Sequence, residues 1–231
     1  MPSRHFVKYT FFQLDPAWRR LDATERERHK QEFAAACESF ALDDHYLRAY
    51  SLVGIRGDTD LMLQTQAENL ERLHEFHVIL QQSGIVQWST IPYSYLAMTK
   101  LSEYSEESRL ALREHSSKYL FVYPFVKTRA WFTLPAPERG RIMREHIRVG
   151  QEFPDIDINT SYSFGLDDQE FVIAFNGDDP GAFLDLVQKL RMTESSSYTL
   201  RDTPTFTCLA MSVERALSAL DGAPVSAALR G

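Results

Sequence analysis

The sequence contains two copies of one pattern, and this internal repeat limits the possible folds more than any other feature. Residues Trp18, Leu21 and Arg26 recur 113 residues further along the chain as Trp131, Leu134 and Arg139. Two more segments recur in the same order at nearly the same spacing: Tyr50-Ser51 as Tyr162-Ser163, and Leu96-Ala97-Met98 as Leu209-Ala210-Met211. Three matches in one order indicate a tandem duplication, so we expect two similar halves.

Both copies show the same order of predicted elements. Alternating apolar and polar residues predict a first strand at 6–12 and at 119–125. Helical periodicity, turn residues and further alternation then predict a helix, two strands, a second helix and a last strand: 23–40, 46–53, 60–65, 67–83 and 93–98 in the first copy, and 137–152, 157–164, 170–175, 179–190 and 205–211 in the second. The order βαββαβ is that of a ferredoxin-like unit.

We therefore expect an α+β fold of tandem-duplicated ferredoxin-like repeats, whose two sheets close face to face into a dimeric α+β barrel. The repeats should span residues 4–101 and 118–216, and a charged linker should join them at 102–117. The remaining residues, 217–231, are expected to form a tail.

Composition excludes some classes of function. The net charge of −7 argues against general affinity for nucleic acid, which requires clustered cations. The start has no signal-peptide pattern, and no apolar run reaches the length of a membrane helix. We expect a cytoplasmic protein without membrane insertion. The two cysteines, Cys37 and Cys208, have no zinc-site spacing.

The duplication allows each copy to serve as a control for the other. Phe33, on the apolar stripe of the first helix, corresponds to His146 in the second copy, and Gly150 follows one turn later. A neutral imidazole there could bind a metal or cofactor, or it could be a core histidine with one hydrogen bond. A glycine inside a helix suggests that something approaches the backbone closely. A single protein ligand does not suit zinc but suits haem, in which the porphyrin supplies four nitrogens.

A second group of polar residues lies on the first predicted strand of the second copy. Tyr123, Lys127 and Arg129 alternate along the chain, which would place a phenol, an ammonium and a guanidinium on one side. The phenol could transfer protons or electrons, and the cations could hold carboxylates. The alternative is an edge strand with solvated basic ends and a core tyrosine.

At these residues the chain resembles the chlorite dismutase superfamily. The matching pieces are Tyr123-Pro124-Phe125-Val126-Lys127, Trp131 with Leu134, Arg139 with Met143, His146 and Gly150, and the run from Tyr162 to Glu170. The resemblance implies a duplicated ferredoxin-like barrel, a homopentamer, and one b-type haem or haem precursor bound in the C-terminal copy. His146 matches the proximal iron ligand of the family, and Glu194 or its neighbourhood would supply the hydrogen-bond partner of that imidazole.

The resemblance also assigns roles near the propionates and at the distal position. Tyr123 matches the tyrosine that forms a radical and attacks the propionates in coproheme decarboxylases, and Lys127 matches a lysine near those propionates. Chlorite dismutases carry a distal arginine where this chain has Ile158, or Asn159 if the alignment shifts by one residue. Neither side chain carries the charge to hold chlorite. His115 could take a distal role if the predicted linker folds inward.

The resulting hypothesis is a haem-binding oxidoreductase that uses hydrogen peroxide to decarboxylate coproheme (iron coproporphyrin) to haem b. Chlorite dismutase-like or peroxidase activity is one alternative. A non-enzymatic protein that binds or transfers haem is another, and a barrel without any cofactor, in which His146 is a core residue, is the last.

Overall fold

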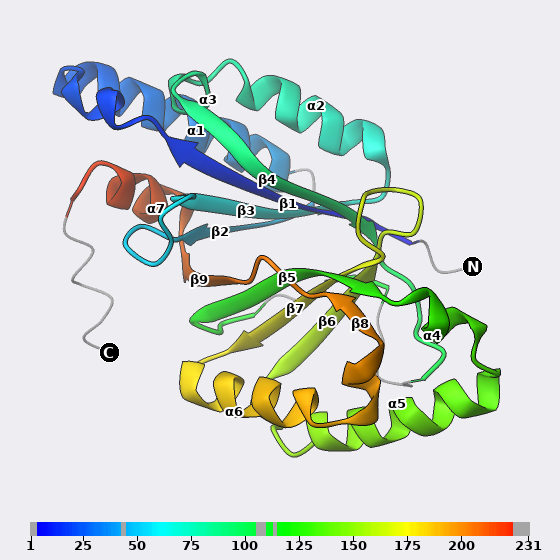
Figure 1. The fold of residues 1–231 in the computed structure, drawn as a ribbon. Coiled ribbons are helices and arrows are strands. Elements are labelled where there is room, and N and C mark those ends of the chain that lie inside the picture. Colours follow the sequence, from blue (N-terminus) through cyan, green and yellow to red (C-terminus); the bar gives the residue numbers. More distant parts are fainter. Residues whose placement is uncertain (1–3, 43–44, 105–109, 113–114, 224–231) are drawn as a thin grey trace. The chain divides into compact units, whose positions relative to one another are not determined.

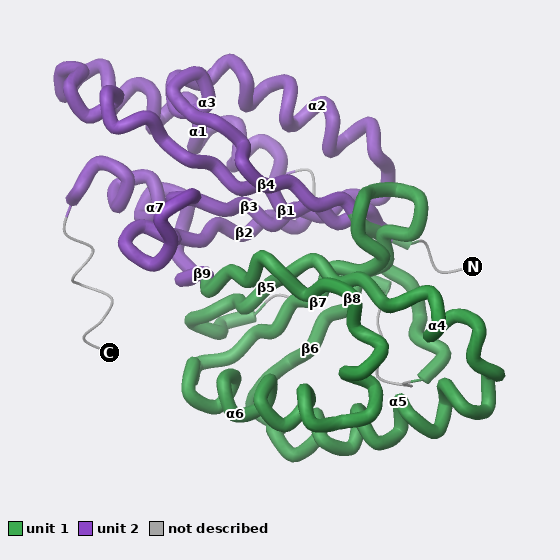
Figure 2. The backbone as a smooth tube through the Cα atoms, viewed as in Figure 1, with its two compact units in different colours: residues 1–4, 97–207 green, residues 5–96, 208–231 purple. Residues whose placement is uncertain are grey.

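The computed structural model describes residues 4–42, 45–104, 110–112 and 115–223. The chain forms two compact units (Figure 2). Unit 2 contains residues 5–96 together with the segment that begins at Cys208, and unit 1 contains residues 97–207 and Arg4. Within the predicted linker at 102–117, residues 105–109 and 113–114 lie outside the described residues.

Unit 2 has the predicted order of elements. Its strands are β1 (Phe6–Leu14), β2 (Tyr46–Ser51), β3 (Leu61–Ala67) and β4 (Ser89–Met98), in the sheet order β4-β1-β3-β2. Helix α1 (Ala23–Leu42) follows β1, and α2 (Leu70–Leu80) follows β3. Two short helices, η1 (Pro16–Arg20) and α3 (Gly84–Gln87), join these elements. Helices α1 and α2 lie on one face of the sheet, as a ferredoxin-like unit requires (Figure 1).

The core of unit 2 extends beyond the predicted first repeat. The end of β9 (Phe206–Met211) pairs with β2, with Ala210 opposite Tyr50. Helix α7 (Val213–Leu220) follows and buries Leu217 and Leu220 in the core that contains Phe33. The predicted tail at 217–231 therefore begins too early, because the apolar residues 217–220 are still needed to cover α1 and the sheet.

Unit 1 repeats this arrangement. Its elements are β5 (Tyr119–Lys127), α4 (Arg129–Thr133), α5 (Ala136–Gly150), β6 (Asp157–Tyr162), β7 (Phe171–Gly177), α6 (Pro180–Arg191), η2 (Glu194–Tyr198) and β8 (Thr199–Arg201). Strand β7 pairs antiparallel with both β5 and β6, and β8 pairs with the end of β5. Helices α5 and α6 cover one face of this sheet (Figure 1). Both copies thus have the predicted ferredoxin-like order, which confirms the α+β fold class.

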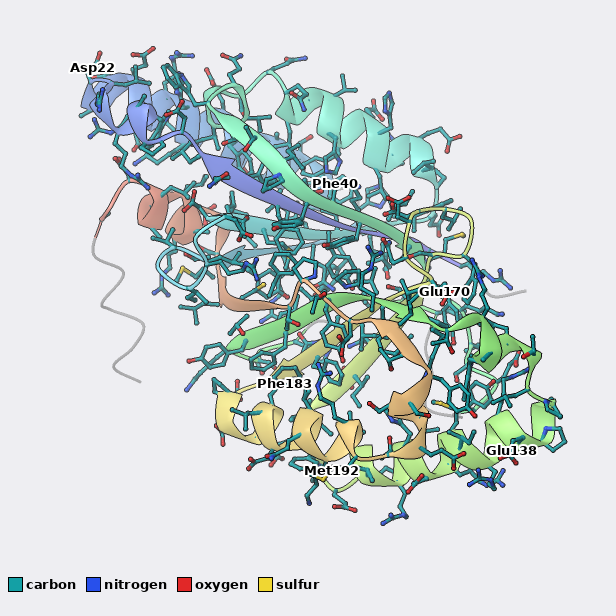
Figure 3. All side chains as sticks on the ribbon, viewed as in Figure 1. Asp22, Phe40, Glu138, Glu170, Phe183 and Met192 are labelled. Atoms are coloured by element: carbon teal, nitrogen blue, oxygen red, sulfur yellow. The ribbon has the colours of Figure 1, made fainter. Side chains whose placement is uncertain are left out.

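An aromatic cluster fixes α6 on the sheet of unit 1. The rings of Phe121 on β5 and Phe183 on α6 stack with centroids 3.9 Å apart, and Phe175 on β7 joins them. Figure 3 shows Phe183 on the sheet-facing side of α6 and Met192 just beyond the end of that helix. Because α6 is held in this position, α6 and η2 lie against α5, and η2 also contacts the end of β5 through Lys127.

None of the helices in the described part of the chain is long and apolar enough to cross a membrane.

Candidate functional site

His146 lies on the face of α5 that contacts the rest of unit 1. The face also carries Ile142, which is fully buried, and Val149. Burial, and secondarily the nearby cation of Lys127, lowers the pKa of His146 to about 4. The imidazole is therefore neutral near pH 7, which is the form that binds metals. The corresponding residue in unit 2, Phe33, is fully buried in an apolar core, so the second copy differs in chemistry at this position.

The partner of the His146 imidazole is Thr193, which precedes η2. The Nδ1 atom of His146 lies 3.3 Å from Oγ1 of Thr193, and that hydroxyl donates to the carbonyl of Leu190 at 2.7 Å. Glu194, the residue named by the prediction, instead accepts a hydrogen bond from Arg141 at 2.7 Å. The prediction named Glu194 or its neighbourhood: the side chain of Glu194 does not reach the imidazole, and the contact comes from the preceding residue, Thr193.

Lys127 ends β5 with its side chain buried. Its Nζ donates to the carbonyl oxygen of Ser195 at 2.8 Å and to the hydroxyl of the same residue at 2.9 Å. The ammonium also lies 4.6 Å from the ring centre of Trp131 on α4. Burial lowers the pKa of Lys127 to about 8, and the charge of Glu170 opposes that shift. This cation therefore holds η2 against β5.

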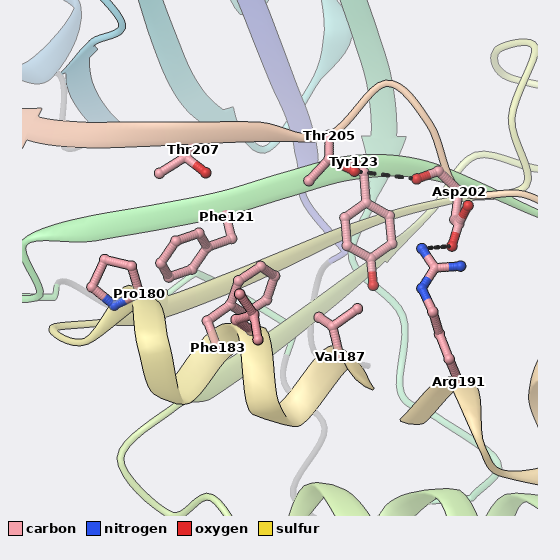
Figure 4. A pocket seen from close by; sticks show the side chains of 10 residues that line it. Phe121, Tyr123, Pro180, Phe183, Val187, Arg191, Asp202, Thr205 and Thr207 are labelled. Atoms are coloured by element: carbon pink, nitrogen blue, oxygen red, sulfur yellow. Dashed lines mark hydrogen bonds and ion pairs between the residues drawn. The ribbon is translucent and has the colours of Figure 1, made fainter. Parts of the chain in front are cut away.

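Tyr123, four residues earlier on β5, has different surroundings. It lines a cavity of about 320 Å³ within unit 1, together with Phe121, Phe183, Val187 and the ion pair of Arg191 and Asp202. That ion pair has an N–O distance of 2.7 Å. Figure 4 shows the hydroxyl of Tyr123 directed from β5 toward α6, between the side chains of Val187 and Arg191. Burial raises the pKa of Tyr123 well above its usual value, so the phenol stays protonated at neutral pH.

The third member of the predicted polar row does not join the other two. Arg129 begins α4 instead of continuing the strand, its side chain is 92% exposed, and it contacts Glu170 at 3.6 Å. The expectation that Tyr123, Lys127 and Arg129 share one side of a strand is wrong, because β5 ends at Lys127, where its pairing with β8 is irregular.

Ile158 on β6 faces α5 one turn beyond His146. Its Cδ1 would lie 3.7 Å from a Cβ atom added at Gly150, which is an ordinary contact distance. Nevertheless Ile158 is 43% exposed, so helix and sheet leave apolar surface uncovered at this point. Asn159 alternates with Ile158 along the strand, and its amide donates to Asp157 at 2.7 Å. His115, from the predicted linker, also contacts Asp157, at 3.1 Å.

The donor set suits a planar cofactor better than a bare metal ion. Within the described residues, no three His, Cys, Asp or Glu side chains gather as a metal site. His146 thus offers one neutral nitrogen, and the uncovered side chain nearby is apolar Ile158. One axial nitrogen and an apolar wall fit a haem, which brings its own four equatorial nitrogens.

Comparison with known proteins identifies the family. The family model for chlorite dismutase matches residues 26–211 of the chain. The chain belongs to the chlorite dismutase family. A coproheme decarboxylase from Mycolicibacterium smegmatis is 31% identical over 174 residues, which cover 74% of this chain and 75% of the relative. The family assignment predicted from the sequence motifs is confirmed.

Solved structures of similar proteins share the fold of this chain. Chlorite dismutase from Candidatus Nitrospira defluvii in complex with imidazole has a TM-score of 0.87 at 20% identity, over 96% of this chain and 97% of that one. A haem-binding protein from Thermus thermophilus has a TM-score of 0.85 at 26% identity, over 95% of this chain and 96% of that one. The predicted duplicated ferredoxin-like fold is thus the fold of this family.

Two residues of the candidate site, Arg191 and Asp202, were given no role from the sequence, and Thr193 was predicted only as part of the neighbourhood of Glu194. A basic residue at the end of a helix is common because it interacts favourably with the helix dipole, so Arg191 had an ordinary explanation. Only the placement of α6 and of the segment after β8 shows that Arg191 and Asp202 meet beside Tyr123.

Proposed function

We propose that this protein is a haem-handling oxidoreductase that uses hydrogen peroxide to decarboxylate iron coproporphyrin to haem b. The observation that carries this proposal is the position of Tyr123 in a cavity beside the Arg191–Asp202 ion pair, where burial raises the pKa of the phenol. The coproheme decarboxylase of M. smegmatis, 31% identical, supports the reaction, and the haem-binding protein of T. thermophilus supports the ligand class.

His146 is the proposed iron ligand. Its imidazole is neutral and partly buried, and its Nδ1 atom is already engaged by Thr193, which leaves Nε2 for the metal. The porphyrin iron would supply the redox chemistry with peroxide. The chain would supply one imidazole nitrogen from His146 and, through Ile158, an apolar side chain opposite α5 at the turn after His146.

Tyr123 is the proposed catalytic residue. Each turnover converts one propionate anion into a vinyl group and carbon dioxide, and this releases two electrons and one proton from the side chain. The two electrons, that proton and one further proton reduce one peroxide to two waters. A phenol held in its protonated form can give up a hydrogen atom and regain one from the propionate. Arg191 lies beside it as a cation for the carboxylate, while Asp202 keeps the guanidinium in place.

Lys127 is proposed to contribute charge to the propionate end of the site. Two of its N–H groups are bound by Ser195, so this role is electrostatic and depends on the position of η2. The resemblance to pentameric relatives leads us to propose a homopentamer as well.

The nature of residue 158 favours decarboxylation over chlorite conversion. A distal side chain that acts on a chlorine oxyanion needs positive charge or hydrogen-bond donors. Ile158 has neither, and Asn159 alternates to the other side of β6 and binds Asp157. We therefore propose that chlorite is not the substrate.

The test is titration of the apo-protein with iron coproporphyrin, followed by stepwise addition of peroxide and mass analysis of the porphyrin. We expect stoichiometric binding and loss of one carbon dioxide and two hydrogen atoms from each of two propionates. His146→Ala should abolish the absorption spectrum of the bound ferric porphyrin. Tyr123→Phe should leave binding intact and stop the loss of carbon dioxide; turnover in that variant would refute the role of Tyr123.

A non-enzymatic haem-binding protein is the second candidate, and the haem-binding relative from T. thermophilus favours it. It predicts stoichiometric binding of haem b and no change in porphyrin mass with peroxide. Absence of any absorption change with either porphyrin would refute both functions.

A further inference from the structure

We propose that Thr193 fixes His146 in the tautomer protonated at Nδ1, and so presents the Nε2 lone pair for binding iron. This inference rests on the proposed haem function for its purpose. Its structural content concerns the protein before any ligand binds, so it can be tested separately.

The single hydrogen of one hydroxyl group decides the tautomer. Thr193 Oγ1 directs that hydrogen to the carbonyl of Leu190 at 2.7 Å. The contact of Oγ1 with Nδ1 of His146, at 3.3 Å, must then use an oxygen lone pair. Nδ1 is therefore the donor. A neutral imidazole carries only one N–H, so Nε2 is left unprotonated.

Thr193 is well placed to impose this choice because its own position is fixed. It is 7% exposed, and its backbone N–H donates to the carbonyl of Leu190 at 3.2 Å, at the end of α6. Two residues later, Ser195 accepts both hydrogen bonds from Lys127. The segment from Thr193 to Ser195 is thus held at one end by α6 and at the other by β5.

Lys127 consequently acts on His146 through this segment. Its ammonium holds Ser195, and Ser195 also contacts the sulfur of Met143 on α5, at 3.8 Å. Lys127 is a positioning residue in this respect, and Thr193 is the residue that touches the imidazole. An acceptor at Nδ1 also orients the ring, and loss of such an outer partner weakens metal binding by about 10- to 100-fold.

The first experiment reads the tautomer in the apo-protein. Long-range nitrogen–proton NMR on the ¹⁵N-labelled protein distinguishes the two tautomers, and a His146→Gln variant assigns the signal. We expect the Nδ1–H tautomer in the wild type and in Thr193→Ser, which keeps the hydroxyl. Thr193→Val keeps the shape but removes the acceptor, so the Nε2–H tautomer, which predominates in free histidine, should replace it. A wild-type protein in the Nε2–H form, or an unchanged tautomer in Thr193→Val, would overturn the inference.

The second experiment measures binding of ferric haem b to the same three proteins. We expect affinity about 10- to 100-fold weaker for Thr193→Val, and near wild type for Thr193→Ser. Equal affinity in all three would show that Thr193 does not orient the ligand. The two proposals fail in different ways. If the wild type has the Nδ1–H tautomer but does not decarboxylate iron coproporphyrin, only the proposed function is contradicted. If it decarboxylates the porphyrin but has the Nε2–H tautomer, only the role of Thr193 is contradicted.

Discussion

The buried ammonium of Lys127 should make the stability of the apo-protein depend on pH in a way that one substitution removes. Lys127 is 7% exposed, and burial lowers its pKa from a usual value near 10.5 to about 8. Below the folded pKa both states are charged, and the full cost of burying the cation is present. As pH rises from about 8 to about 10.5 the folded protein loses this proton before the unfolded chain does, so the cost disappears and stability rises.

The size of the effect follows from the pKa difference. A shift of one pKa unit is equivalent to about 1.4 kcal/mol, so the cost near pH 7 is about 3 kcal/mol, and most of it, about 2–3 kcal/mol, is regained between pH 7 and pH 10. Other groups titrate in this window: burial raises the pKa of both Cys37 and Cys208, which opposes the trend. Comparison of the wild type with Lys127→Met removes these contributions, because both proteins share them.

The assay is urea unfolding of the wild type and Lys127→Met between pH 7 and pH 10, followed by circular dichroism. Loss of the two hydrogen bonds to Ser195 contributes a constant difference, whereas the charge contributes one that varies with pH. Over this range we expect the free energy of unfolding of the wild type to rise by about 2–3 kcal/mol relative to that of the variant. Lys118→Met, at an exposed position, is the matched control and should show no such trend. A difference that stays constant from pH 7 to pH 10 would refute the reasoning.

Two glycine substitutions test the packing at two places: beside the buried His29 in unit 2, and at the proposed haem position in unit 1. In Gly84→Ala the new Cβ would overlap the ring of buried His29, which accepts a hydrogen bond from Trp18, so we expect about 2–3 kcal/mol of destabilisation by thermal unfolding. Gly57→Ala, with no atom within 4 Å, is its control, and an equal loss in both would contradict the overlap. Gly150→Ala meets only Ile158, at 3.7 Å, so the apo-protein should gain up to about 1 kcal/mol in stability. If haem lies against Gly150, the same variant should bind ferric haem b more weakly in an absorption titration, and unchanged affinity would place the ligand elsewhere.

The fold could be predicted because its signals are local and occur twice. Alternation in β1 and β5 and helical periodicity in α1 and α5 each specify an element, and the repeat supplies a second instance of every one. The errors lie where the chain leaves the repeat. The sequence predicts a tail from residue 217 because a short apolar stretch does not indicate which surface it covers. In the structure, residues 217–220 belong to α7, which covers the core of unit 2.

The candidate site could be predicted only in part, because some of its contacts depend on the path of the backbone outside the repeated elements. His146 stands out because it replaces Phe33, a contrast that is visible in the sequence alone. Its hydrogen-bond partner comes from the start of η2, where a shift of one residue changes which side chain reaches α5. Thr193 and Glu194 are neighbours in sequence, yet one contacts the imidazole and the other contacts Arg141. Only the backbone path after α6 decides between them.

The contrast between Phe33 and His146 implies that His146 makes unit 1 less stable at this proposed functional position than an aromatic side chain would. Phe33 is 0% exposed and packs edge-to-face on Phe12, whereas His146 buries a polar ring against the single hydroxyl of Thr193. His146→Phe should therefore stabilise the apo-protein, by about 1 kcal/mol in thermal unfolding, because it replaces a partly satisfied polar group with an apolar one. The same variant should lose the ferric haem spectrum. His146→Ala is the control, since it also removes the ligand but leaves a cavity and should destabilise. If His146→Phe instead lowers the stability as much as His146→Ala does, then the imidazole is an integral part of the core, and its resemblance to an iron ligand no longer explains why it is there.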